Sequence, residues 1–206
     1  PSSIYLNQFV LRGLNTVSQD VSANDNGAYT GDVSASQLKS IGVGYSIVGH
    51  SERRKYYQDS KKVNQKIIRL LENNLHVILC IGEEKENRLN HQVFDVLKKE
   101  ISEALDGIND KEKLRDIIIA YEPIWSIGTG LIPTNNEIEE VIAFIKEYFA
   151  KNYHVKMQVL YGGSVNNENI DVLKKIPNID GYLVGGCSIN KEKFQELITK
   201  VNNDDR

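Results

Sequence analysis

The chain has 206 residues, of which 40% are hydrophobic, so it is long enough for one domain with a substantial buried core. Its 25 Lys and Arg residues nearly balance its 28 Asp and Glu residues, and a net charge of −3 gives no general field that would attract nucleic acid or an anionic membrane. No apolar run reaches the roughly 18 residues of a membrane span, and no signal peptide is visible, so we expect no nucleic-acid partner and no membrane partner.

The hydrophobic pattern predicts six strands that alternate with helices. Strands are expected over Asn15–Val21, Tyr45–Gly49, His76–Ile81, Ile117–Tyr121, Gln158–Tyr161 and Gly181–Val184. Helices are expected near Pro1, over Ser34–Ile41, Ser60–Asn73 and Asn90–Leu105, after the capping box Thr134–Glu137, and over Glu168–Lys175 and Glu192–Val201, with a loop over Ser22–Gly31. This alternation predicts a parallel sheet with right-handed crossovers in a single domain spanning residues 1–206.

Two cysteines and four histidines are present, and neither set has the spacing of a metal site. Cys80 and Cys187 lie in apolar, strand-like or strand-end surroundings and form no CxxC motif. We therefore expect a reduced, cytoplasmic compartment, with no metal and no cofactor.

Polar and glycine residues suited to chemistry follow the predicted strands at their C-terminal ends. They are His50, Glu83, Glu122, Gly163 with Ser164, and Gly185 with Gly186. Ligands bind at this edge both in a (β/α) barrel and in a doubly wound sheet. No G-x-G-x-x-G motif follows an early strand, which argues against a dinucleotide site.

Glu122 stands at the end of the apolar strand Ile117–Tyr121 and is followed at once by Pro123, which stops the strand. Gly128 and Gly130 then let the backbone turn tightly or approach a ligand. The pattern suggests a base beneath a mobile cover. The alternative is a salt-bridged surface carboxylate followed by ordinary turn glycines.

Four segments of the chain resemble the triosephosphate isomerase family in their order, their residues and their approximate spacing. They are Ile47-Val-Gly-His-Ser-Glu-Arg-Arg54, Ala120-Tyr-Glu-Pro-Ile-Trp-Ser-Ile-Gly-Thr-Gly130, Tyr161-Gly-Gly-Ser-Val-Asn166 and Asp180-Gly-Tyr-Leu-Val-Gly-Gly186. The resemblance covers nearly the whole chain. It implies a TIM (β/α)8 barrel and an aldose–ketose isomerase that interconverts dihydroxyacetone phosphate and D-glyceraldehyde 3-phosphate through an enediol(ate), in glycolysis and gluconeogenesis.

The resemblance also implies the catalytic roles. Glu122 would be the base and His50 the electrophile that polarises the substrate carbonyl. A helix opening at Ser51 would favour a neutral His50, because its N-terminal dipole opposes a positive charge. Glu52 would support the site or shuttle protons. Taken alone, His50 could instead cap the core, and Glu52 could form a salt bridge.

Backbone N–H groups of Gly128, Ser164, Gly185 and Gly186 would hold the substrate phosphate without a Lys or Arg. The segment Pro123–Gly130 resembles the family's closing lid. One departure follows it, because Leu131-Ile-Pro133 stands where the family often has Lys-Thr-Ala, and Pro133 would stiffen the hinge.

The loop Ala23–Gly31 resembles the family's dimer loop. Thr30 would reach into a neighbouring subunit, so we expect a homodimer.

Only six of the eight barrel strands are expected, because the resemblance begins at the helix after the family's second strand. The family's Asn-x-Lys after its first strand has no counterpart here, so we expect an N-terminally incomplete barrel that is weakly active or inactive. Two other functions stay open. One is a non-catalytic, phosphate-binding TIM-barrel scaffold, and the other is a barrel isomerase or lyase acting on a different phosphorylated sugar.

Overall fold

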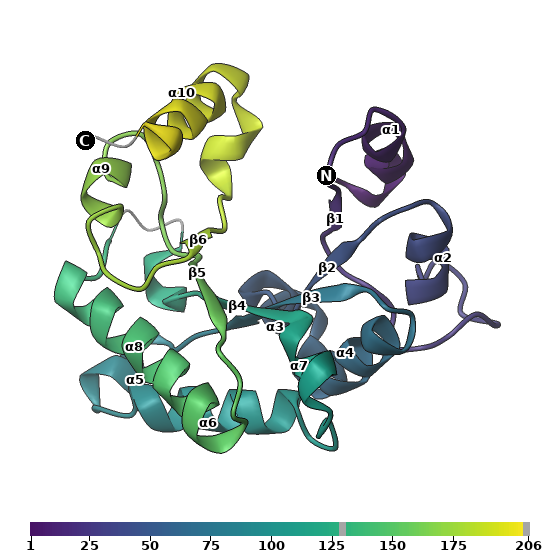
Figure 1. Cartoon of the computed structure of the whole chain (residues 1–206), viewed down its shortest axis with the longest axis horizontal. Helices are drawn as coiled ribbons and strands as arrows, with labels where there is room; N and C mark the ends of the chain where they lie inside the picture. Colours follow the sequence, from purple (N-terminus) through teal and green to yellow (C-terminus); the bar gives the residue numbers. More distant parts are fainter. Residues whose placement is uncertain (128–130, 204–206) are drawn as a thin grey trace. The chain divides into compact units, whose positions relative to one another are not determined.

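Strands and helices alternate along the chain in a computed structural model that describes residues 1–127 and 131–203 (Figure 1). The strands are β1 Val17–Ser18, β2 Tyr45–Val48, β3 His76–Ile81, β4 Ile117–Tyr121, β5 Gln158–Tyr161 and β6 Gly181–Tyr182. The α-helices are α1 Leu6–Leu11, α2 Ala35–Ser40, α3 Ser51–Tyr57, α4 Val63–Glu72, α5 Lys85–Leu89, α6 Val93–Ala104, α7 Lys111–Arg115, α8 Asn135–Asn152, α9 Ile170–Leu173 and α10 Lys191–Asn202. The 3-10 helices are η1 Ser3–Tyr5, η2 Asp59–Lys62, η3 Ile124–Ser126 and η4 Gly186–Ile189.

The strands hydrogen-bond in chain order, β1-β2-β3-β4-β5-β6. The registers of β1 with β2, of β2 with β3 and of β5 with β6 are parallel. Parallel strands joined through helices confirm the predicted sheet and place the chain in the (β/α) barrel class, with six barrel strands among the described residues.

Three strands are shorter than predicted. The strand expected over Asn15–Val21 pairs only at Val17 and Ser18. The chain then leaves the sheet, because the Asp20 side chain bonds Lys66 and the Ser22 N–H bonds the carbonyl of Val33. The strand expected over Tyr45–Gly49 ends one residue early, at Val48. The strand expected over Gly181–Val184 comprises only Gly181 and Tyr182, although the Leu183 N–H still bonds the Tyr161 carbonyl.

Two short helices, α5 and α7, were not predicted. Each has five residues and begins at an acidic N-cap, Glu84 for α5 and Asp110 for α7. Their buried apolar content is small, with Leu114 the buried residue of α7, so neither produces the periodic pattern on which a sequence prediction depends.

The described residues fall into two compact units, and β4 contributes to both. The first unit comprises Pro1–Ile81 and Lys98–Ile119. In it α4 packs on β2 and β3 through the buried face Val63, Ile67, Leu70 and Leu71 (Figure 1). The opposite face of α4 is polar, as its amphipathic sequence predicts.

The second unit comprises Gly82–Leu97 and Ala120–Arg206. Helix α8 packs on β5 and buries Ile138, Val141, Ile142, Ile145 and Phe149 at helical spacing. The predicted capping box starts this helix, since Thr134 Oγ1 accepts the N–H of Glu137 and the Glu137 carboxylate accepts the N–H of Thr134. Helix α10 packs on α9 and η4.

Within residues 1–127 and 131–203, none of the helices combines the length and the hydrophobicity that crossing a membrane requires.

Candidate active site

Glu122 follows the last residue of β4 and is 2% exposed. Two glycines make room for it in the second unit. A Cβ at Gly82 would overlap the Glu122 carbonyl oxygen, and a Cβ at Gly162 would lie 3.1 Å from the Glu122 Cγ. The N–H of Gly162 donates to the carbonyl of Tyr121 at 2.8 Å, which fixes the backbone beside Glu122. The predicted base is therefore a buried carboxylate in a closely packed position.

Glu83 holds the turn that follows Glu122. Its side chain is fully buried, and its Oε1 accepts the indole N–H of Trp125 at 2.9 Å and the hydroxyl of Tyr121 at 3.2 Å. Its backbone carbonyl accepts the N–H of Ile124 at 3.1 Å. Side chain and backbone of one residue thus hold η3, which begins two residues after Glu122.

Arg88 supplies the cation for this buried carboxylate, with its Nε 2.9 Å from the Glu83 Oε1. Burial alone would lower the pKa of Arg88, but its acidic neighbours outweigh burial and raise that pKa above its usual value: Tyr121 in its ionised form, and the Glu83 and Glu137 carboxylates. Burial and the Glu83 charge raise the pKa of Tyr121 well above its usual value, so Tyr121 stays a neutral phenol that donates to Glu83.

A cavity of about 240 Å³ opens in the second unit beside three of the predicted phosphate ligands. It is lined by Ile127, Gly163, Ser164, Val165, Asn166, Gly185, Gly186 and Cys187. A Cβ at Gly185 or Gly186 would meet no described heavy atom within 4 Å, so a ligand can approach this backbone closely. The hydroxyl of Ser164 donates to the carbonyl of Ser126 at 3.0 Å, which leaves its backbone as the group facing a ligand. Gly128, the fourth predicted ligand, lies outside the described residues, as does part of the predicted lid.

Tyr161 and Ser126 are both fully buried next to Gly163. A Cβ at Gly163 would overlap the Tyr161 hydroxyl and lie 3.0 Å from the Ser126 Oγ, so only glycine fits there. Burial raises the pKa of Tyr161 to about 12, against the weaker lowering effect of the Ser126 hydroxyl. Tyr161 is therefore uncharged at neutral pH.

His50 lies in the first unit as the N-cap of α3. Its Nδ1 accepts the N–H of Glu52 at 3.3 Å. Arg54 fixes the backbone of Gly49, the residue before His50, because the Arg54 Nε donates to the Gly49 carbonyl at 2.7 Å. Glu52 is mostly exposed, and its carboxylate lies 3.9 Å from the His50 Nδ1.

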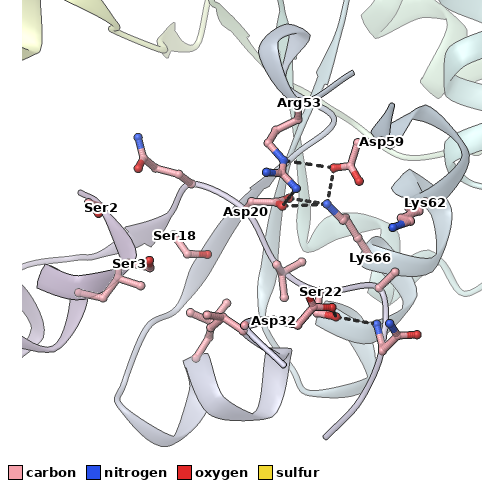
Figure 2. A pocket seen from close by; sticks show the side chains of 18 residues that line it. Ser2, Ser3, Ser18, Asp20, Ser22, Asp32, Arg53, Asp59, Lys62 and Lys66 are labelled. Atoms are coloured by element: carbon pink, nitrogen blue, oxygen red, sulfur yellow. Dashed lines mark hydrogen bonds and ion pairs between the residues drawn. The ribbon is translucent and has the colours of Figure 1, made fainter. Parts of the chain in front are cut away.

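An ion cluster anchors α3, the helix that carries His50 at its start. Arg53 of α3 contacts Asp20 at 2.7 Å and Asp59 at 3.5 Å. Lys66 of α4 is buried and contacts the same two carboxylates (Figure 2). The cluster borders a polar cavity of about 340 Å³. Because the cluster pairs two cations with two carboxylates, the free-energy cost of burying their charges is offset by their mutual attraction.

The structure therefore gathers Ser164, Gly185 and Gly186 at one cavity and buries Glu122 at the end of β4. Sequence reasoning marked Glu83 by its place after a strand but missed Arg88. No local signal marked Arg88, because its partners Tyr121 and Glu137 are 33 and 49 residues away. In the part of the chain that the structure describes, no group of three or more His, Cys, Asp and Glu residues could hold a metal ion.

Comparisons with known proteins agree on one family. The family model for triosephosphate isomerase matches residues 1–201. A triosephosphate isomerase of Malacoplasma penetrans is 41% identical over 203 residues, which are 95% of this chain and 81% of the relative. That of Alkaliphilus oremlandii is 42% identical over 87% of this chain and 74% of the relative, and that of Mycoplasmopsis agalactiae is 42% identical over 93% of this chain and 72% of the relative.

Proposed function

The chain belongs to the triosephosphate isomerase family, and we propose that it interconverts dihydroxyacetone phosphate and D-glyceraldehyde 3-phosphate with Glu122 as the base and His50 as the electrophile. The Glu122 carboxylate takes the proton from the carbon next to the substrate carbonyl. The Nε2–H of a neutral His50 donates to the carbonyl oxygen as negative charge develops on it. The resulting enediol(ate) regains the proton on the neighbouring carbon, so no atom is gained or lost.

The observation that carries this proposal is the burial of Glu122 at the C-terminal end of β4, between Gly82 and Gly162. A carboxylate in a packed, water-poor position has a fixed direction for proton transfer, and water cannot intercept the intermediate. Glu52, whose carboxylate lies 3.9 Å from the His50 Nδ1, is proposed to support the site or to shuttle protons.

The test is a coupled assay of the purified protein with glyceraldehyde 3-phosphate, at protein concentrations high enough to quantify the weak turnover expected of this chain. Glu122→Asp keeps the charge but withdraws it by one methylene, and we expect kcat to fall about 100-fold. His50→Asn removes the Nε2–H while an Asn oxygen can still cap α3, so a fall in kcat there would report chemistry rather than folding. Turnover that does not depend on Glu122 would contradict the proposal and favour the non-catalytic scaffold or a different isomerase.

The backbone of Ser164, Gly185 and Gly186 is proposed to hold the substrate phosphate, together with Gly128. The support is the cavity that these described glycines leave open. Gly186→Ala fits the fold but places a methyl group towards the ligand. We expect a raised KM and weaker inhibition by inorganic phosphate, with kcat changed less. An unchanged KM would place the phosphate elsewhere.

A homodimer through the loop Ala23–Gly31 is proposed from the resemblance. The base of this loop is held by the Ser22 N–H on the Val33 carbonyl and by the Ser34 hydroxyl on the Asn26 Oδ1. Its tip, including Thr30, is exposed. Sedimentation equilibrium should give a dimer, and Thr30→Arg should weaken it, whereas Thr199→Arg at an exposed position on α10 should not.

A cytoplasmic location is proposed as well, because both cysteines are free thiols in the structure. Cell fractionation with an antibody to the chain tests it, and recovery with an exported marker would contradict it.

A further inference from the structure

Arg88 joins three separate elements of the second unit. Its Nε lies 2.9 Å from the Glu83 Oε1, its Nη2 donates to the Tyr121 hydroxyl at 3.1 Å, and its Nη1 lies 3.0 Å from the Glu137 Oε1. Tyr121 is the last residue of β4, and Glu137 lies in the first turn of α8. The planar guanidinium uses a different N–H group for each partner, a geometry that Lys cannot reproduce.

On one side Arg88 controls the turn after Glu122. Glu83 is fully buried, and the Arg88 Nε lies 2.9 Å from its Oε1. The same Oε1 accepts the indole N–H of Trp125 at 2.9 Å. The position of Trp125 therefore depends on Arg88 through Glu83, and the Arg88 guanidinium also lies 5.5 Å from the Trp125 ring.

On the other side Arg88 reaches the start of α8. The two oxygens of Glu137 have different partners. Oε2 accepts the N–H and the hydroxyl of Thr134 at 2.7 and 2.8 Å, and Oε1 lies 3.0 Å from the Arg88 Nη1. Arg88 thus contacts the carboxylate that fixes the N-cap of α8.

We propose that Arg88 is a positioning residue of the isomerase, which couples the turn after Glu122 to the first turn of α8. This inference rests on the proposed role of Glu122. Arg88 bonds Glu83, Tyr121 and Glu137. It acts through Tyr121, which precedes the base, and through Glu83 and Trp125, which hold the turn after it. A change at Glu137 is therefore transmitted to Trp125 through one side chain.

Trp125 is the single tryptophan of the chain, so its fluorescence reports this network directly and does not require turnover. Glu137→Gln retains a capping box, because Gln serves as well as Glu at that position, and removes only the charge facing Arg88. We expect a shift of Trp125 emission in Glu137→Gln and a larger shift, to longer wavelength, in Arg88→Met. Glu112→Gln is the matched control, because it removes an exposed partner of Arg115 on α7.

Kinetics separate positioning from a structural ion pair. We expect Arg88→Met to lower kcat about 10- to 100-fold with a much smaller change in KM, and Arg88→Lys to restore only part of kcat. In a double-mutant cycle on kcat, Trp125→Phe and Glu137→Gln should be non-additive when Arg88 is present and additive in Arg88→Met.

Three results would overturn the inference: additive effects with Arg88 present, unchanged Trp125 emission in Glu137→Gln, or a kcat of Arg88→Met equal to that of the parent. If Arg88→Met fails to fold, Glu137→Gln still tests the inference. Its Trp125 emission and its double-mutant cycle with Trp125→Phe can both be measured with Arg88 present. A kcat that is insensitive to Glu122→Asp would refute the proposed base and leave the emission coupling as a separate result, so the two failures are distinguishable.

Discussion

Gly82 lies so close to Glu122 that any side chain at position 82 would overlap the carbonyl oxygen of Glu122. The obstacle is backbone and cannot rotate away. We therefore predict that Gly82→Ala destabilises the protein by about 3 kcal/mol, or more if the end of β4 cannot shift, and lowers kcat by moving the base. Urea unfolding and the coupled assay measure the two effects.

Gly44→Ala is the control for that substitution. A Cβ at Gly44 would meet no described heavy atom within 4 Å, so we expect stability within about 1 kcal/mol of the parent and an unchanged kcat. Equal destabilisation by the two substitutions would contradict the steric argument.

Lys66 pairs with Asp20 and Asp59 in a buried cluster. Lys66→Met would leave two carboxylates with only Arg53 to compensate them, and we predict a loss of about 3–5 kcal/mol in the free energy of unfolding. Lys39→Met, at an exposed position on α2, should cost little. A small loss at Lys66 would show that the cluster relaxes or admits water.

The pKa of Tyr161, raised by burial from 10.0 to about 12, predicts an alkaline effect. The folded protein holds this proton more tightly than the unfolded chain does. The stability contribution is therefore complete below pH 10 and is lost as the pH rises from 10 to 12, about 2–3 kcal/mol in all. Tyr161→Phe should flatten this part of the stability profile, and an unchanged slope would contradict the prediction.

Glu137 predicts the opposite pH dependence. Burial would raise its pKa, but the hydrogen bonds from Thr134 and the charge of Arg88 outweigh burial and lower that pKa below 4.5. The resulting stability is present above pH 4.5 and is lost as the pH falls through the lowered value. The free energy of unfolding, measured between pH 3 and 7, should depend less steeply on pH in Glu137→Gln than in the parent. An identical slope would assign acid unfolding to other carboxylates.

Local signals allowed much of the fold to be predicted. The strands His76–Ile81, Ile117–Tyr121 and Gln158–Tyr161 match the prediction at both ends, because apolar runs bounded by polar or turn residues mark buried strands. The capping box at Thr134 was equally predictable, since both partners lie within one turn. β1 is shorter than predicted because Asp20 bonds Lys66 and the Ser22 N–H bonds the Val33 carbonyl, and a local pattern does not contain such contacts.

Arg88 could not be predicted for the same reason. Its partners Tyr121 and Glu137 are 33 and 49 residues away, and Lys66 finds Asp20 at a separation of 46. The sequence identified the residue types at strand ends, including Glu83, but the partner of a buried charge is chosen by the tertiary structure. Glu122→Asp, His50→Asn and Gly186→Ala test the predicted base, the predicted electrophile and one predicted phosphate ligand.

The fixed turn at Trp125 and the fixed cap at Thr134 also bear on how this protein can change in evolution. The stretch 127–133 is joined at both ends to well-held structure, and one inserted residue would add only about 0.1 kcal/mol of loop-closure entropy. Insertions of one residue there would therefore be removed mainly by selection on turnover, and among natural variants they should track loss of isomerase activity rather than loss of stability.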